Sequence, residues 1–235
     1  GEVLRARETG EREPSGAENA PGRGTLWKIL LGVSFGTAVA SFIYEIAWIR
    51  MVSLELCTAT HSFELMLSAF ILGLALGSLW VRERADRFTD PVRALGWIQW
   101  IMGAAALATL PVYVASFGWT VDLLSAVNRT PAGYTLFNLS RYGMALAVML
   151  PATFCAGTTL PLITRTLLSA GEGERAIGWV YGVNTLGSIL AVATASLILL
   201  PLMGLKPLLV LGGGLDMAIG VLLLTLGARG AAGEE

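Results

Sequence analysis

The sequence predicts an all-α integral membrane protein with about six transmembrane helices, and three observations carry that prediction. Hydrophobic residues make up 54% of the 235 residues. Charged residues make up only 14%, whereas a typical soluble domain has about 25%. Apolar segments close to the roughly 20 residues that a helix needs to cross a bilayer recur along the chain.

The chain begins with a polar segment. Residues 1–24 are rich in glycine, proline and charges of both signs, a composition that cannot bury enough apolar surface to fold alone. No apolar stretch follows a short basic one there, so we do not predict a secretory signal peptide. We assign residues 1–24 as a polar cytoplasmic tail, 25–229 as a six-helix transmembrane domain, and 230–235 as a short polar C-terminus.

Prolines support the division of the apolar region into six spans. Pro91 precedes the third span and Pro201 ends the fifth. Pro207 lies in the first turn of the sixth, where a missing N–H group costs little. The predicted spans are residues 26–50, 62–81, 92–117, 138–164, 177–200 and 205–227.

The basic residues predict an orientation. With a cytoplasmic amino terminus, twelve of the sixteen Lys and Arg residues lie inside, as the positive-inside rule requires. Both termini are therefore predicted to be cytoplasmic, and residues 118–137 form the longest external loop. The basic residues left outside are Arg50, Arg129, Arg141 and Lys206.

Pairs of glycines four residues apart lie on one helix face and predict close approach of a neighbouring helix. Such pairs occur in the first, second and fifth spans. They are Gly32 with Gly36, Gly73 with Gly77, and Gly178 with Gly182.

Glu45 is an acid deep inside the first span. A carboxylate at that depth must face a bundle interior or a wet cavity and needs a partner. Arg50 follows five residues later, which is offset from the i,i+4 spacing of an ion pair along a helix. Glu45 is therefore either a cation or proton site, or a structural acid bonded to another helix.

His61 and Glu64 are three residues apart at the start of the second span. A negative charge in the first turn of a helix is stabilising without a ligand, and His61 would then cap that turn. The alternative is a pH-sensing pair, since a histidine beside a carboxylate titrates near neutral pH.

Three further polar residues lie in predicted spans, where each is costly unless it is paired. Arg141 begins the fourth span, Asn184 lies inside the fifth, and Asp216 lies inside the sixth. Asp216 follows three consecutive glycines that weaken the helix, and it is a candidate cavity residue. Asn184 is expected to form hydrogen bonds between helices.

The sequence contains no recognisable catalytic centre. It lacks the metalloprotease, serine-hydrolase and phosphate-binding motifs. Its single histidine and two cysteines, Cys57 and Cys155, do not form a metal cluster. We therefore predict no enzyme activity, no cofactor and no metal. The net charge of −1 gives no reason to expect nucleic-acid binding.

Four segments in order resemble the membrane part of the fused major-facilitator/spermidine-synthase-like proteins of bacteria. They are Tyr44-Glu45-x-x-Trp48-x-Arg50; Ala69-Phe70-x-x-Gly73-Leu74-Ala75-Leu76-Gly77-Ser78; Leu150-Pro151-Ala152-Thr153 with Gly157 and Leu160-Pro161-Leu162; and Tyr181-Gly182-x-Asn184-Thr185-Leu186-Gly187 with Leu200-Pro201-x-x-Gly204. Residues 77–87 also resemble the glycine-then-Asp-Arg loop of many major facilitator transporters.

The resemblance implies half of a major-facilitator-type bundle in the bacterial inner membrane. In that family a soluble domain similar to spermidine synthase follows the helices. This sequence ends at Glu235, directly after the sixth span. The resemblance therefore implies a relative of the membrane half, with no aminopropyltransferase activity.

Three functions stay open at this point. The first is a module that binds or transports a cationic solute such as a polyamine, with a second copy or a partner completing the transporter. The second is an accessory subunit that scaffolds a larger membrane complex. The third is the membrane anchor of a split enzyme whose synthase-like soluble domain is a separate chain. The lipid bilayer is the common partner of all three.

Overall fold

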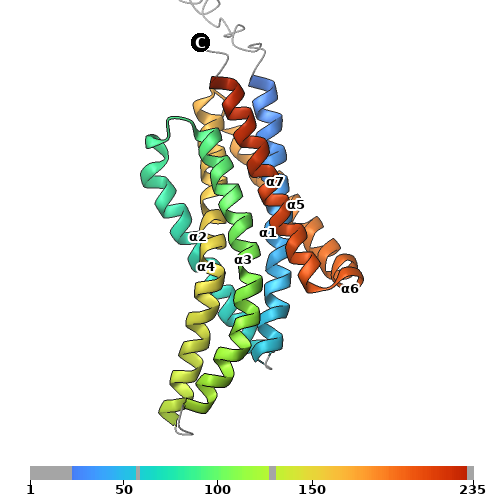
Figure 1. The fold of residues 1–235 in the computed structure, drawn as a ribbon. Coiled ribbons are helices and arrows are strands. Elements are labelled where there is room, and N and C mark those ends of the chain that lie inside the picture. Colours follow the sequence, from blue (N-terminus) through green and yellow to red (C-terminus); the bar gives the residue numbers. More distant parts are fainter. Residues whose placement is uncertain (1–22, 57–58, 127–130, 232–235) are drawn as a thin grey trace, which may run out of the picture.

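The computed structural model describes residues 23–56, 59–126 and 131–231, and all regular structure in this part of the chain is helical (Figure 1). The long helices are α1 (Arg23–Leu56), α2 (Ala59–Arg84), α3 (Pro91–Ala126), α4 (Pro131–Ser169), α5 (Arg175–Thr194) and α7 (Leu205–Ala231). The short elements are a 3₁₀ turn, η1 (Ala85–Arg87), a π-helical turn, η2 (Ala195–Leu199), and α6 (Leu200–Met203).

Six helical segments of the described chain are long and apolar enough to cross a membrane. One of them combines α5, η2 and α6 into the segment Arg175–Met203, and Gly204, whose φ angle is 79°, ends it. The predicted fold class, an all-α integral membrane protein with six spans, is therefore confirmed. The other five segments are Gly24–Leu54, Met66–Arg84, Pro91–Ser116, Thr135–Ser169 and Leu205–Ala228.

The stretch predicted as a long external loop, residues 118–137, separates the third and fourth apolar spans as expected, but much of it is helical. Helix α3 continues to Ala126 and α4 already begins at Pro131, while residues 127–130 lie outside the described residues. The prediction ended the span where the bilayer thickness requires it to end. A helix can continue into water beyond the bilayer, because its backbone hydrogen bonds are internal to the segment.

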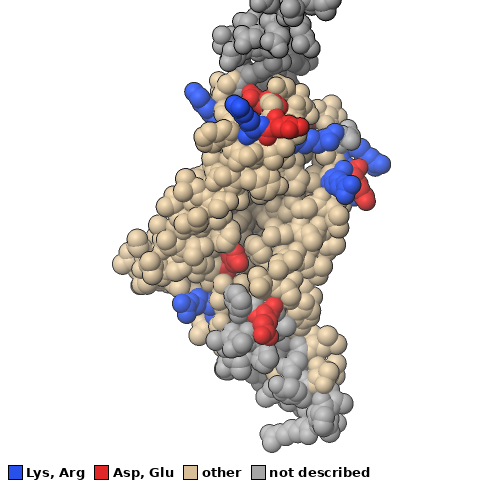
Figure 2. Space-filling view, turned by 180° about the vertical axis from the view of Figure 1, so that it is seen from behind, with Lys and Arg blue, Asp and Glu red and all other residues tan. Residues whose placement is uncertain are grey.

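Successive long helices run in opposite directions, so α1 begins and α7 ends at the same end of the bundle (Figure 1). Figure 2 shows a broad band with very few charged atoms and a concentration of charged side chains at one end of the molecule. The described basic residues at the end where α1 begins are Lys28, Arg82, Arg84, Arg87, Arg93, Arg165 and Arg175, whereas Arg50 and Lys206 lie toward the other end.

Glycines allow α2 and α4 to pack with their backbones in close contact. A Cβ atom added at Gly73 would collide with Thr153, and one at Gly77 would collide with the carbonyl oxygen of Phe154. Gly157 on α4 has the same relation to Leu74 on α2. The predicted close approach at Gly73 and Gly77 is therefore confirmed, with α4 as the partner helix.

A second close contact joins α3 to α7, which the sequence analysis did not anticipate. Gly96 and Gly103 on α3 face Gly220 and Gly213 on α7, and the two glycines of each helix are seven residues apart. A Cβ at Gly220 would lie 2.7 Å from the backbone nitrogen of Trp100. Paired glycines on both helices bring these backbones together, as is common where lipid is the solvent.

The prediction for the fifth span is wrong within this chain. A Cβ added at Gly178 or Gly182 would meet no heavy atom within 4 Å, and the same holds for Gly32. Gly36 does face a neighbour, the side chain of Ile219 on α7. Four-residue spacing selects a helix face but does not determine which face another helix covers.

Candidate functional site

Helix α1 carries a stripe of polar and aromatic side chains along one face. Thr37, Ser41, Tyr44 and Trp48 follow one another at spacings of four, three and four residues, which places them on the same side of a helix. All four are buried, and Tyr44 and Trp48 are at most 1% exposed. Each of them has a polar side chain as a hydrogen-bond partner.

Two of these contacts join α1 to α3. The Gln99 side-chain amide donates to the Thr37 hydroxyl oxygen over 2.6 Å. The Trp48 indole N–H donates to the Thr109 hydroxyl oxygen over 3.1 Å. Buried polar groups need such partners in an apolar medium, so these contacts fix the rotation of α1 against α3.

The third contact joins α1 to α7 through a buried carboxyl group. The Tyr44 hydroxyl donates to Asp216 Oδ2 over 3.1 Å, and the Ser41 hydroxyl lies 3.1 Å from the same Tyr44 oxygen. Asp216 is fully buried. Ser41, Tyr44 and Asp216 therefore form a continuous hydrogen-bonded chain from α1 into the centre of the bundle.

Among the described residues, three buried side-chain oxygens have no hydrogen-bond partner in the protein. An unpaired buried oxygen costs free energy, and in native proteins it calls for an explanation such as a ligand or a catalytic role. All three belong to residues on α1, α3 or α7. They are Glu45 Oε2, Gln99 Oε1 and Asp216 Oδ1.

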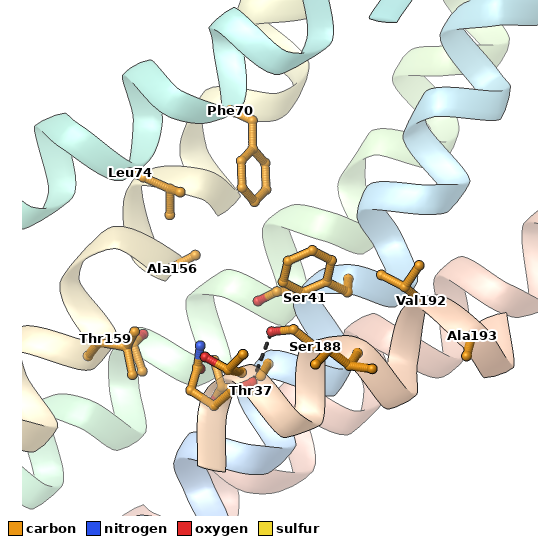
Figure 3. Close-up of a pocket in the computed structure, with 15 residues that line it drawn as sticks. Thr37, Ser41, Phe70, Leu74, Ala156, Thr159, Ser188, Val192 and Ala193 are labelled. Carbon is orange, nitrogen blue, oxygen red and sulfur yellow. Dashed lines mark hydrogen bonds between the residues drawn. The ribbon is translucent and has the colours of Figure 1, made fainter. Parts of the chain in front are cut away.

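A cavity of about 780 Å³ lies between α1, α2, α4 and α5 (Figure 3). Its size is within the range of small-molecule binding pockets. Phe42 and Phe70 contribute aromatic rings to an otherwise mainly aliphatic lining. The polar residues that line it are Thr37, Ser41, Thr159, Asn184, Thr185 and Ser188.

The hydroxyl groups of the cavity present acceptor oxygens to its interior. The Ser188 hydroxyl donates to the Asn184 carbonyl oxygen over 2.9 Å, the dashed contact in Figure 3. Thr159 and Thr185 donate likewise to carbonyl oxygens of their own helices. A hydroxyl whose proton is used in this way keeps lone pairs to offer, so the polar part of the lining suits a cationic or hydrogen-bond-donating ligand.

Glu45 lies one helical turn beyond the cavity lining. On α1, Ser41 and Phe42 line the cavity, and Glu45 follows them by four and three residues, on the same face. The residue is partly buried, and one of its carboxylate oxygens is buried without a partner. The arrangement places a carboxyl group next to a cavity that no charged residue lines.

The structure brings together three of the six candidate residues. Asn184 lines the cavity, Glu45 adjoins it, and Asp216 is connected to it through Tyr44 and Ser41.

The remaining candidates do not line the cavity. Arg50 and Glu64 are exposed residues toward the end of the bundle opposite the start of α1. Arg141 belongs to α4, but its side chain, like that of His61, lies outside the described residues.

Sequence reasoning missed Thr37, Ser41 and Gln99 as members of the network and treated Tyr44 only as part of a motif. A signal for the residues on α1 exists in the sequence. Polar or hydrogen-bonding residues at positions 37, 41, 44 and 48 repeat with the period of one helix face inside an apolar span. Gln99 offers no such signal, since nothing around it repeats.

A second cavity, of about 510 Å³, lies between α3 and α4. Thr109 is the polar residue in its lining, and the rest of the lining is apolar. The larger cavity has six polar residues in its lining and Glu45 beside it, so it is the better candidate for a site that recognises a ligand.

Comparison with protein-family models, with curated proteins and with solved structures gives no match for this chain.

Proposed function

We propose that this protein is a non-catalytic membrane module that binds a cationic organic solute in the cavity between α1, α2, α4 and α5, and that it serves in transport of that solute. The observation that carries the proposal is the position of Glu45. Its carboxylate has a buried oxygen without a partner and lies one turn beyond Ser41 and Phe42 of the lining. An intramembrane carboxylate beside a cavity is typical of a cation pathway.

The lining favours one class of cation. Its side chains are mostly aliphatic and aromatic, and aromatic faces attract organic cations. Among the described acidic residues, Glu45 is the one that adjoins this cavity. A cation with one positive charge and an apolar body therefore fits better than a polyamine, whose several ammonium groups need several carboxylates.

The charge distribution supports a cytoplasmic location for the start of α1 and the end of α7. The described basic residues are concentrated at that end of the bundle, which the positive-inside rule places in the cytoplasm. We therefore propose both termini inside, in a bacterial inner membrane, and kinship with the membrane half of the spermidine-synthase-like fusion proteins. That kinship rests on the sequence motifs alone.

Binding of tetraphenylphosphonium to the purified protein in detergent tests the proposal. This probe has one positive charge and an apolar aromatic body. We expect saturable binding by isothermal titration calorimetry and a loss of affinity of about tenfold or more in Glu45→Gln, because a partly desolvated charge pair is worth about 1.4 kcal/mol or more. Spermidine, measured in parallel, should bind more weakly.

Glu83→Gln is the matched control, because Glu83 is exposed at the charged end of α2. It should bind tetraphenylphosphonium as the unmodified protein does. Equal affinity of Glu45→Gln and the unmodified protein for both cations would contradict the proposed function.

One observation favours a second candidate function, an accessory subunit of a larger membrane complex. Helix α5 exposes large side chains, with Trp179 at 62% and Ile189 at 60%. A Cβ added at Gly178 or Gly182 would meet no heavy atom of the described residues within 4 Å. Exposed glycines beside large apolar side chains suit a further helix from a second copy or another subunit. Cross-linking of Gly182→Cys in membranes would detect that neighbour, and recovery of only uncross-linked monomer would count against this function.

A further inference from the structure

The hydrogen-bonded chain from Ser41 to Asp216 connects the cavity with a buried carboxyl group. Ser41 lines the cavity, and Tyr44 bridges Ser41 and Asp216 with two contacts of 3.1 Å. Asp216 itself does not line the cavity and is fully buried. Its second oxygen, Oδ1, has no hydrogen-bond partner among the described residues.

We propose that Asp216 carries a proton that is released when a cation occupies the cavity, with the hydroxyl groups of Tyr44 and Ser41 as the relay. This inference rests on the proposed function and names its coupling ion. In the protonated form Oδ1 is a neutral carbonyl oxygen, for which the lack of a hydrogen-bond partner costs less free energy than it does for a carboxylate oxygen.

The geometry supplies the electrostatic coupling. The two contacts of 3.1 Å place the Ser41 oxygen within about 6 Å of Asp216 Oδ2. A cation that reaches the Ser41 side of the cavity therefore lies close enough to stabilise an ionised Asp216 across a medium of low dielectric constant. Without that cation, a single hydrogen bond from a tyrosine does not compensate for a full charge buried among apolar side chains.

The proton transfer balances without any other reactant. In the protonated form Asp216 donates from Oδ2 to the Tyr44 oxygen, and Tyr44 donates to Ser41. On release the Asp216 proton passes to the Tyr44 oxygen, the Tyr44 proton passes to the Ser41 oxygen, and the Ser41 proton leaves into the cavity. Tyr44 then donates to the ionised Asp216 Oδ2, the direction seen in the structure. Each hydroxyl gains one proton and loses one, so Asp216 alone changes charge. The contact between Ser41 and Tyr44 can form with either oxygen as the donor, as a relay requires.

The groups around Asp216 leave few alternatives for the titrating site. From α1 it is faced by Tyr44, and from α4 the thiol of Cys155 is close enough to interact with it electrostatically. On α3 it is Gly103, which has no ionisable side chain, that packs beside residues 213 and 217 of α7. Glu45 is the other carboxyl group near the cavity, so it is the alternative source of a proton and the experiment has to separate the two.

Proton release on addition of tetraphenylphosphonium, measured with a pH indicator in weakly buffered detergent solution, tests the proposal. We expect about one proton released per cation bound and a binding constant that rises by up to about tenfold per pH unit, as linkage to one proton requires. Asp216→Asn, which keeps the side-chain shape, should still bind the cation but lose both effects. Tyr44→Phe should bind the cation and lose rapid release.

The outcomes separate this inference from the proposed function. No binding by the unmodified protein would overturn both. Binding without proton release, or release that persists in Asp216→Asn, would overturn the inference alone. Loss of cation binding in a correctly folded Asp216→Asn would also overturn it, because Asp216 would then be the binding carboxylate itself.

An infrared difference spectrum of the unmodified protein keeps the test valid if Asp216→Asn fails to fold. Addition of the cation should remove the C=O stretching band of a protonated carboxyl group. That change should persist in Glu45→Gln at a cation concentration that saturates the variant. Absence of any such change, or its dependence on Glu45 alone, would contradict the proposal.

Discussion

The two sides of helix α1 pack in different ways. On one side, α3 and α7 meet through paired glycines and form hydrogen bonds to the α1 stripe through Gln99, Thr109 and Asp216. On the other side, α1 and α5 face α2 and α4 across a cavity of about 780 Å³. We call the first side, formed by α3 and α7, the sealed framework. We call the second side, where α2, α4 and α5 surround the cavity, the open side.

The difference shows where this chain retains polar groups that packing does not need. All three unpaired buried oxygens belong to α1 or to the two helices of the sealed framework. Two of these residues are hydrogen-bonded toward the cavity, Gln99 to Thr37 directly and Asp216 to Ser41 through Tyr44. The unpaired polar atoms therefore belong to α1 and the sealed framework, and the cavity on the open side gives a ligand access to the residues bonded to them.

The largest expected effect comes from filling the contact between α3 and α7. Gly103→Leu places a side chain against the backbone of Gly213, which cannot move aside, and should cost about 3 kcal/mol or more. Thermal unfolding in detergent measures it. Gly182→Leu is the matched control, because a Cβ there meets nothing within 4 Å. Equal destabilisation by the two changes would contradict the division into a sealed and an open side.

A smaller loss is expected from Tyr44→Phe, which removes the hydroxyl that bonds to Asp216 and Ser41. Stability should fall by about 1 kcal/mol, since hydrogen bonds between helices in membranes are modest. Tyr181→Phe, at a residue that is 47% exposed, should change nothing measurable. If the two variants unfold at the same temperature, the hydrogen-bonded chain from Ser41 to Asp216 contributes nothing to the stability of the bundle.

Replacing Gln99 should have the opposite sign. Gln99→Met gives up one hydrogen bond to Thr37 but also removes the unpaired oxygen Oε1. Because an unpaired buried acceptor costs more than one such bond returns, stability should rise by about 1 kcal/mol in the same unfolding assay. A destabilised variant would show that the amide is retained for packing.

The smallest effect is expected on the open side. Ser188→Ala removes a hydroxyl that bonds only to a carbonyl of its own helix, so the unfolding free energy should change by less than about 0.5 kcal/mol. Chemical denaturation in mixed micelles measures the unfolding free energy. A loss of more than about 1 kcal/mol would mean that the cavity lining holds the fold together.

Most of the fold could be predicted from the sequence, because the length of an apolar span is set by the bilayer and breaks show as polar or proline-containing segments. The pairing of helices could not. Gly73 and Gly178 have the same four-residue signature, yet only Gly73 meets a neighbouring helix. The seven-residue glycine spacing that joins α3 to α7 stands out only once the two helices are known to pack together.

Part of the candidate site could also be predicted from the sequence. Glu45, Asn184 and Asp216 attract attention individually, since each is costly in an apolar span. Their connection depends on Ser41 and Tyr44, whose hydroxyl groups are ordinary in membrane helices. Residues 172 positions apart come together through helix packing, which the local sequence does not encode.

Protection of a cavity residue by the cation tests the central claim most directly. Ser188→Cys, in a protein with Cys57 and Cys155 replaced by alanine, places a reactive thiol in the lining, and Val210→Cys places one on the exposed face of α7. Tetraphenylphosphonium should slow maleimide labelling at position 188 and leave position 210 unchanged. Equal labelling rates at position 188 with and without saturating cation would contradict a ligand site between α1, α2, α4 and α5.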